Sequence, residues 1–189
     1  MTYDTQTIRD AAFSIMENLD NPASRTSSGQ QWLVELKDGT KANLKTAAKG
    51  TLMVKTKAPE NDADIVGFNA DVSHILAAVS LPGETTVTAY LIPLKVVESA
   101  FRRNNMEWCA KGRKQGTTWA LHFEHVEKDY FGWDMATVWS EYAVGSIELP
   151  AADKVFADKD LNRSLTIAEA KKGLSLTFGV DEGAIEITI

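Results

Sequence analysis

The sequence has little cysteine and no long apolar run, and each absence narrows the class of protein. Cys109 is the one cysteine, so no disulfide can form within the chain, and a reducing compartment is indicated. No apolar stretch approaches the length of a membrane span, and the first residues, Met-Thr-Tyr-Asp-Thr-Gln, do not form a secretory signal. We therefore expect a soluble, cytoplasmic protein without a membrane partner.

Positive charge is also scarce. The chain has 20 Lys and Arg against 26 Asp and Glu, which gives a formal net charge of −6 at pH 7. This balance argues against general affinity for nucleic acid but leaves room for a local basic groove. The sequence also lacks a Walker loop, a dinucleotide glycine fingerprint and a Cys-x-x-Cys pair. Its 189 residues are enough for one medium domain with a real core.

The hydrophobic pattern predicts an α+β protein, with a mixed, mostly antiparallel sheet flanked by helices. We expect the core domain to span residues 1–149 and a small C-terminal subdomain, helix–loop–helix–strand, to span 150–189. Polar or irregular sequence predicts loops over 20–31 and 105–116. Helices are predicted over 5–19, 93–104 and 134–142, and strands over 32–46 (a hairpin), 51–57, 64–68, 74–81, 85–92, 117–126 and 146–149.

The hairpin at residues 32–46 turns at Asp38-Gly39, and two registers are possible. A two-residue turn would pair Lys37 with Thr40, whereas a three-residue turn with left-handed Gly39 would pair Leu36 with Thr40. In the second register one face is apolar, and the other carries Glu35, Lys37, Lys41, Asn43 and Lys45. Because a slip of one residue exchanges the faces, the segregated pattern favours the three-residue turn.

The order helix, hairpin, further strands and then Tyr90-Leu-Ile-Pro93 leading into a helix, with Lys45-Thr46 at a strand end, resembles the PD-(D/E)XK restriction-endonuclease-like superfamily. The resemblance covers roughly residues 5–104. It implies Mg²⁺-dependent phosphodiester hydrolysis, in which carboxylates hold the metal and a lysine orients or activates the water. An enzyme of this kind would be a metal-dependent nuclease.

The resemblance implies catalytic roles for residues of the hairpin. Glu35-x-Lys37 spells the acid-x-lysine signature, Lys45 shares its face, and Asp20 lies upstream. Glu35 would be the metal carboxylate and Lys45 the water-orienting lysine. The sequence departs from the pattern at Asn43, which stands where an acid is expected and is a poor Mg²⁺ ligand beside a carboxylate. The nuclease hypothesis therefore includes a protein in which catalysis is degraded or absent. The alternative hypothesis is that Glu35, Lys37 and Lys45 belong to a solvated hairpin face without a catalytic role.

A second segment, residues 158–169, resembles an EF-hand calcium loop. Oxygen donors stand at the ligand positions, and the resemblance implies a Ca²⁺ site. Arg163 occupies the position where glycine permits the sharp turn, and a side chain is strained there. The alternative is a polar connector that ends in a capping box. The implied ligands are Asp158, Asp160, Asn162, Ser164 and Glu169.

The third feature is a basic segment with one aromatic residue, opposed only by Glu107. Cationic side chains around an aromatic ring suit a phosphate backbone and base stacking, although charge runs are also typical of solvated surface. The leading hypothesis is thus a nuclease-like protein that contacts nucleic acid. The rival is a non-enzymatic binding or assembly protein, with a protein partner and a calcium-binding C-terminal loop. The predicted nucleic-acid residues are Arg102, Arg103, Trp108, Lys111, Arg113 and Lys114.

Overall fold

The computed structural model describes residues 3–27, 32–69, 71–124, 134–150 and 171. The chain divides into two compact units, residues 1–152 and 153–189. The elements described below belong to the first unit. Apart from Lys171, which is helical, the helices and the strand predicted after residue 150 lie outside the described residues.

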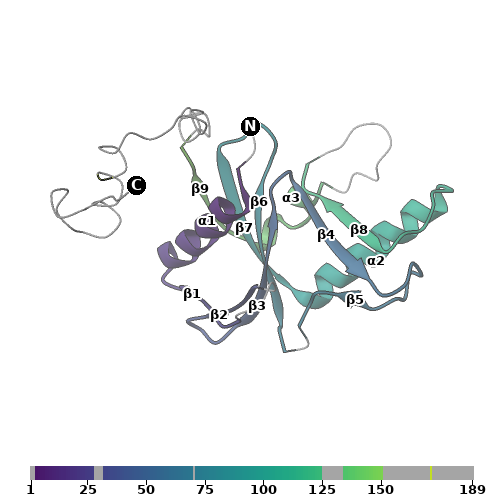
Figure 1. The fold of residues 1–189 in the computed structure, drawn as a ribbon, viewed down its shortest axis with the longest axis horizontal. Helices are drawn as coiled ribbons and strands as arrows, with labels where there is room; N and C mark the ends of the chain where they lie inside the picture. The colour runs from purple at the N-terminus through teal and green to yellow at the C-terminus, as the bar shows by residue number, and fades with distance from the viewer. Residues whose placement is uncertain (1–2, 28–31, 70, 125–133, 151–170, 172–189) are drawn as a thin grey trace, which may run out of the picture. The chain divides into compact units, whose positions relative to one another are not determined.

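The described elements confirm an α+β fold (Figure 1), with mostly antiparallel strands and helices packed on them. The helices are α1 (Thr5–Asn18), α2 (Leu94–Ala110), the short α3 (Met135–Val138) and the 3-10 turn η1 (Ser140–Tyr142). The strands are β1 (Ala23–Arg25), β2 (Trp32–Leu36), β3 (Lys41–Ala47), β4 (Thr51–Thr56), β5 (Ile65–Val66), β6 (His74–Ser80), β7 (Thr86–Pro93), β8 (Thr118–His122) and β9 (Ala143–Glu148).

The described strands form two sheets. The larger has the order β1-β2-β3-β6-β7-β9, and the smaller has the order β5-β4-β8. Neighbouring strands are antiparallel except β3 and β6, which run parallel. A parallel pair needs a long crossover connection, and here residues 48–73 supply it and contain β4 and β5. The crossover thus builds the second sheet beside the first.

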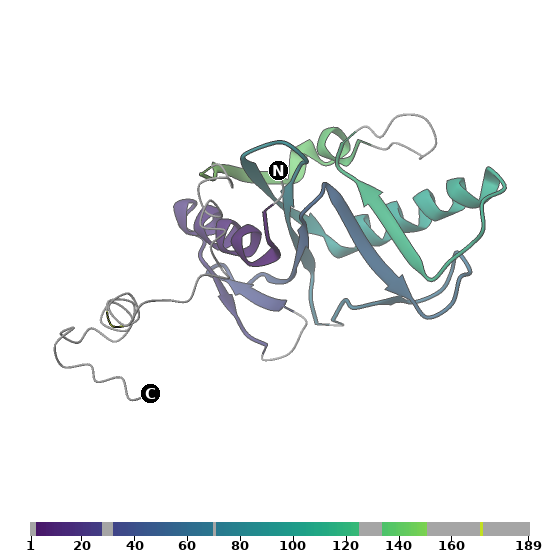
Figure 2. The same ribbon diagram turned by 45° about the horizontal axis from the view of Figure 1, so that its top comes forward.

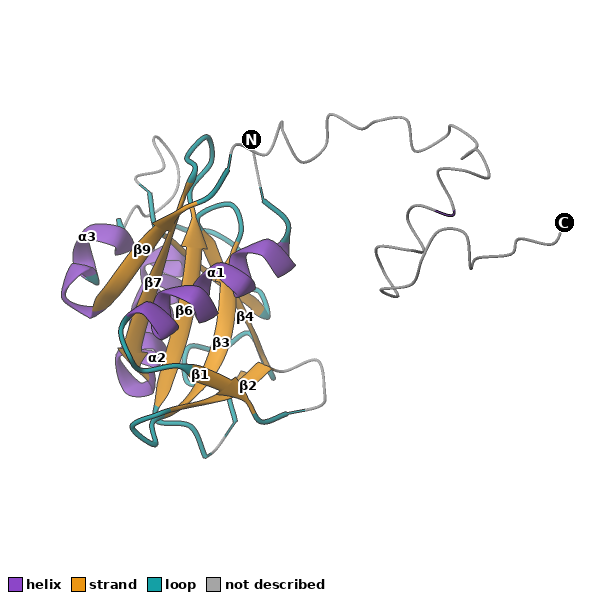
Figure 3. Ribbon diagram, turned by 90° about the vertical axis from the view of Figure 1, so that its left-hand side faces the viewer, coloured by secondary structure: helices purple, strands orange, loops and turns teal. Residues whose placement is uncertain are grey.

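The helix α1 covers one face of the larger sheet (Figure 3). Asp4 caps it, because its carboxylate accepts hydrogen bonds from the N–H groups of Gln6 and Thr7 at 2.8 and 3.0 Å. Its buried side chains recur at helical spacing and meet apolar residues of β2, β3, β6 and β7. The helical members of this core are Ile8, Ala11, Ala12, Ile15 and Met16.

The smaller sheet and α2 cover the opposite face (Figure 2). Trp119, Leu121 and Phe123 point inward, as their alternation predicts. The Phe123 ring lies 5.2 Å from Tyr90 and 5.7 Å from Trp139, measured between ring centroids. The larger sheet is therefore covered on both faces, so few of its positions are exposed where polar side chains could form a site.

The predicted hairpin register is confirmed. Val34 pairs with Ala42, and the N–H of Leu36 donates to the carbonyl of Thr40 at 2.9 Å. Gly39 has φ +84°, the left-handed conformation that the three-residue turn requires.

Two loop predictions were wrong in part. The helix α2 continues to Ala110, beyond the predicted end at 104, and Asn105 within the extension is buried. Its amide donates to the side-chain oxygen of Asn61 at 2.5 Å, so a polar residue that indicates a loop is satisfied inside the fold. Residues 23–25, also predicted as loop, form β1 because their backbone pairs with β2.

Candidate functional site

The polar face of the hairpin does not bring Glu35 and Lys45 together. Glu35 lies opposite Lys41, and Lys45 stands four residues farther along β3. At about 3.3 Å per residue this places the two Cα positions about 13 Å apart along the strand. A glutamate and a lysine separated by that span do not form one compact catalytic site.

Lys37 lies in the hairpin turn and contacts a different carboxylate. Its ammonium lies 2.7 Å from Asp20, just after α1, and both side chains are exposed. An exposed pair of this kind contributes little to stability. Lys37 therefore links the hairpin turn to the segment that follows α1.

Lys45 lies in a half-buried environment without a carboxylate partner among the described residues. Burial lowers its pKa, and its Nζ lies 5.6 Å from the centroid of the Phe68 ring. Next on the same face is Asn43, 1% exposed, whose oxygen accepts a hydrogen bond from the N–H of Asn69 at 2.9 Å. The Asn43 Nδ2 has no partner among the described residues.

This donor set does not fit a magnesium ion. Mg²⁺ takes oxygen ligands, and in enzymes it is usually held by one or two carboxylates. The face around Lys45 offers nitrogen donors, and in the described part of the chain no three His, Cys, Asp or Glu side chains gather where they could hold a metal. We therefore derive no metal-dependent step at the hairpin. The magnesium site stays a prediction of the sequence resemblance.

The C-terminal end of α2 does gather predicted nucleic-acid residues. Gly112, with φ +74°, turns the chain back after the helix. The returning segment places the Arg113 guanidinium 4.8 Å from the Trp108 ring centroid, and the indole N–H donates to the carbonyl of Lys114 at 3.1 Å. Lys111 ends the helix as its C-terminal cap.

A cavity of about 180 Å³ opens beside this turn, between the end of α2 and β8. Asn104 donates to the carbonyl of Ala120 at 2.6 Å, while its own Oδ1 is buried without a partner among the described residues. His122 is half-buried, burial lowers its pKa, and its Nδ1 lies 3.1 Å from the Thr51 hydroxyl. The cavity is thus lined by two indole rings together with amide, imidazole and ammonium groups. These groups belong to Asn104, Asn105, Trp108, Lys114, Trp119 and His122.

Arg102 and Arg103 lie about two turns before the C-terminal end of α2. Arg102 donates to the carbonyls of Asn61 and Ala63 at 2.8 and 3.1 Å, so it holds the loop before β5. Arg103 pairs with Glu107 one helical turn away, at 3.4 Å. The members of the predicted group that lie together at the C-terminal end of α2 and in the turn after it are Trp108, Lys111, Arg113 and Lys114.

The sequence patterns missed a second aromatic site with basic neighbours. The guanidinium groups of Arg9 and Arg25 lie 4.7 and 3.9 Å from the ring centroid of Trp32. Trp32 also packs against the core beneath α1 and lies 6.2 Å from Phe13. These residues come from α1, β1 and β2, so no local pattern in the sequence links them.

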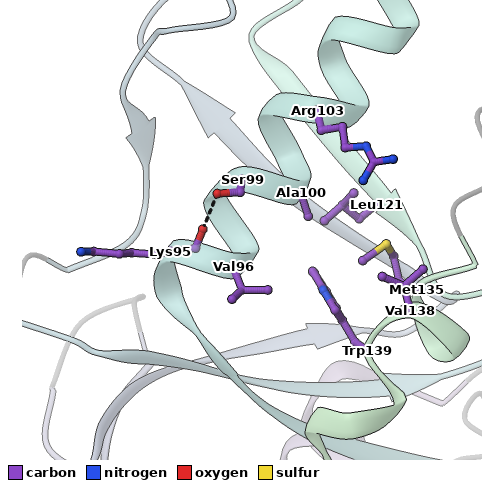
Figure 4. A pocket seen from close by; sticks show the side chains of 9 residues that line it. All are labelled: Lys95, Val96, Ser99, Ala100, Arg103, Leu121, Met135, Val138 and Trp139. Atoms are coloured by element: carbon purple, nitrogen blue, oxygen red, sulfur yellow. Dashed lines mark hydrogen bonds between the residues drawn. The ribbon is translucent and has the colours of Figure 1, made fainter.

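The sequence also missed an apolar cavity of about 410 Å³ between α2, β8 and α3 (Figure 4). The lining residues are Lys95, Val96, Ser99, Ala100, Arg103, Leu121, Met135, Val138 and Trp139.

The predicted calcium ligands, Asp158, Asp160, Asn162, Ser164 and Glu169, lie outside the described residues. Among the helices that the structure describes, none combines the length and the apolar character needed to cross a membrane. No protein-family model, curated protein or solved structure matches the chain.

Proposed function

We propose that the protein contacts single-stranded nucleic acid through the C-terminal end of α2 and the turn after it. The observation that carries the proposal is the Arg113 guanidinium over the Trp108 ring, in a turn that also contains Lys111 and Lys114. An aromatic ring offers any base a stacking surface, and lysine and arginine side chains attract the phosphates.

The adjacent cavity favours an unpaired base over a duplex. Its volume of about 180 Å³ is too small for a double helix, and its wall carries amide and imidazole groups that can hydrogen-bond to a base edge. The overall negative charge argues against nonspecific attraction over the whole surface and favours a local basic segment such as this one. We assign binding to this site, and hydrolysis at the hairpin stays a prediction of the PD-(D/E)XK resemblance.

A titration of a fluorescently labelled single-stranded oligonucleotide, followed by anisotropy at low salt, tests the proposal. Replacing Trp108 by alanine removes the stacking surface. We expect Trp108→Ala to weaken binding roughly 5- to 150-fold, since stacking contributes about 1–3 kcal/mol per base. Lys49→Ala, at an exposed lysine before β4, is the control and should bind as the wild type does.

The salt dependence separates phosphate contacts from stacking. Each phosphate contact that is lost should lower the slope of log K against log salt by about 0.7 for a single strand. The double variant Lys111→Ala, Lys114→Ala should therefore show a shallower slope, whereas Trp108→Ala should keep the wild-type slope. Absence of binding at low salt, or equal binding by wild type and Trp108→Ala, contradicts the proposal.

A further inference from the structure

The cavity between α2, β8 and α3 has the size and lining of a small-molecule site. Its volume is about 410 Å³, and ligand pockets typically span about 300–1,000 Å³ with mostly apolar walls. Figure 4 shows the apolar side chains converging from three elements. They are Val96 and Ala100 of α2, Leu121 of β8, Met135 and Val138 of α3, and Trp139 directly after α3.

Three polar side chains of α2 also line this cavity, namely Lys95, Ser99 and Arg103, and the Ser99 hydroxyl donates to the Lys95 carbonyl at 2.7 Å. Arg103 lines the cavity together with Leu121 and Met135, whereas Lys95 points away from it (Figure 4). Trp139, whose ring closes one side of the cavity, is only 2% exposed.

We propose that this cavity binds a small amphiphilic acid, with its apolar body on the α2–β8–α3 wall and its anionic head on Arg103. A guanidinium binds carboxylate or sulfonate oxygens through paired, charge-assisted hydrogen bonds. Arg103 already contacts Glu107 at 3.4 Å, but both side chains are substantially exposed. Such a pair is weak, so a ligand anion can join or replace Glu107.

This site is separate from the proposed nucleic-acid site. The cavity beside Trp108 is lined by Asn104 and Asn105 of α2, whereas the apolar cavity is lined by Val96, Ala100 and Arg103 of the same helix. An oligonucleotide should therefore not displace a ligand from the apolar cavity, and Trp108→Ala should leave ligand binding unchanged. The two proposals can fail independently.

Two dyes of similar shape and different charge test the inference on the full chain. Anilinonaphthalene sulfonate is an apolar anion, and N-phenylnaphthylamine is its neutral counterpart; both fluoresce more strongly in apolar sites. We expect the wild type to bind both and to prefer the anion. Arg103→Gln should weaken the sulfonate about tenfold, the loss of one charge-assisted contact, and leave the neutral dye unchanged.

Matched variants separate loss of the site from loss of the fold. Ala100→Trp fills the cavity and should abolish binding of both dyes, whereas Ala110→Trp, at an exposed position of the same helix, should not. Glu107→Gln breaks the same ion pair as Arg103→Gln but keeps the guanidinium, so it should bind the sulfonate at least as tightly as the wild type. If Ala100→Trp does not fold by circular dichroism, Val138→Glu at a 46% exposed lining position replaces it.

The contrary results are equally definite. No fluorescence increase with the wild type, retained dye binding when the cavity is filled, or an equal loss of both dyes in Arg103→Gln would each overturn the proposal.

Discussion

Lys45 carries a charge in a half-buried position next to the Phe68 ring and the enclosed Asn43 amide. Burial lowers its pKa, and no carboxylate in the described part of the chain offsets this effect. The folded protein therefore holds the charged lysine less favourably than the unfolded chain does. This has a measurable consequence for stability.

The free energy of unfolding should depend on pH through Lys45. Between the lowered folded pKa and the ordinary value of 10.5, the unfolded state binds more protons than the folded state, so stability rises with pH in that window. Lys45→Met should lack this rise and should be more stable than the wild type at neutral pH, with the difference narrowing toward pH 10.5. Urea unfolding at both pH values measures it.

Other titrating groups are common to both proteins, so the difference between them isolates Lys45. Lys49→Met, at an exposed site, is the control and should follow the wild-type pH dependence. Parallel pH profiles for wild type and Lys45→Met would show that the lysine is not destabilised by the fold.

The environment of Lys45 and Asn43 also shows what a sequence pattern can and cannot predict. Alternation along 41–47, combined with the hairpin register, predicts correctly that Lys45 and Asn43 share a face. It does not predict the environment of that face, because Phe68 and Asn69 come from a loop after β5. The local pattern predicts on which face of the strand a side chain lies, whereas the burial and the pKa of that side chain depend on residues distant in sequence.

At the scale of elements, the packing of α1 depends on a glycine in β9. A Cβ built on Gly145 would lie 2.9 Å from the Cγ2 of Ile15, a buried residue of α1. Branched Ile15 has little room to move within a close-packed core.

Gly145→Ala should therefore force α1 away from the sheet and lower the free energy of unfolding by about 1–3 kcal/mol, the usual cost of overpacking. Chemical denaturation measures the change. Gly116→Ala is the matched control, since a Cβ there meets nothing within 4 Å, and its effect should be small. Equal stability of the wild type and Gly145→Ala would mean that α1 and β9 are not in close contact.

Elements with a clear apolar period were predictable, and elements that depend on polar contacts were not. The helix α1 and the β2–β3 hairpin follow from spacing and from the turn at Gly39. The last turns of α2 were missed because Asn105 is satisfied by Asn61, and β1 was missed because backbone pairing requires no side-chain period.

At the scale of the first unit, α2 lies between two candidate surfaces. Its C-terminal end carries the Trp108 site, and its earlier turns line the apolar cavity. The basic segment was visible in the sequence because its residues lie within thirteen positions of one another, from Arg102 to Lys114. The apolar cavity was not, since residues 95–103, 121 and 135–139 meet only after β8 and α3 pack on α2. The Arg9–Trp32–Arg25 group was also missed in the sequence, because its members come from three different elements.

Photo-crosslinking locates the nucleic-acid contact most directly. A single-stranded oligonucleotide containing iodouridine is irradiated with the full chain, and the modified peptide is identified by mass spectrometry. Because iodouridine reacts with aromatic side chains that stack on it, we predict a crosslink at Trp108, lost in Trp108→Phe when the tryptophan adduct is followed. No crosslink, or a crosslink at Trp32 and not at Trp108, would contradict the proposed site at the end of α2.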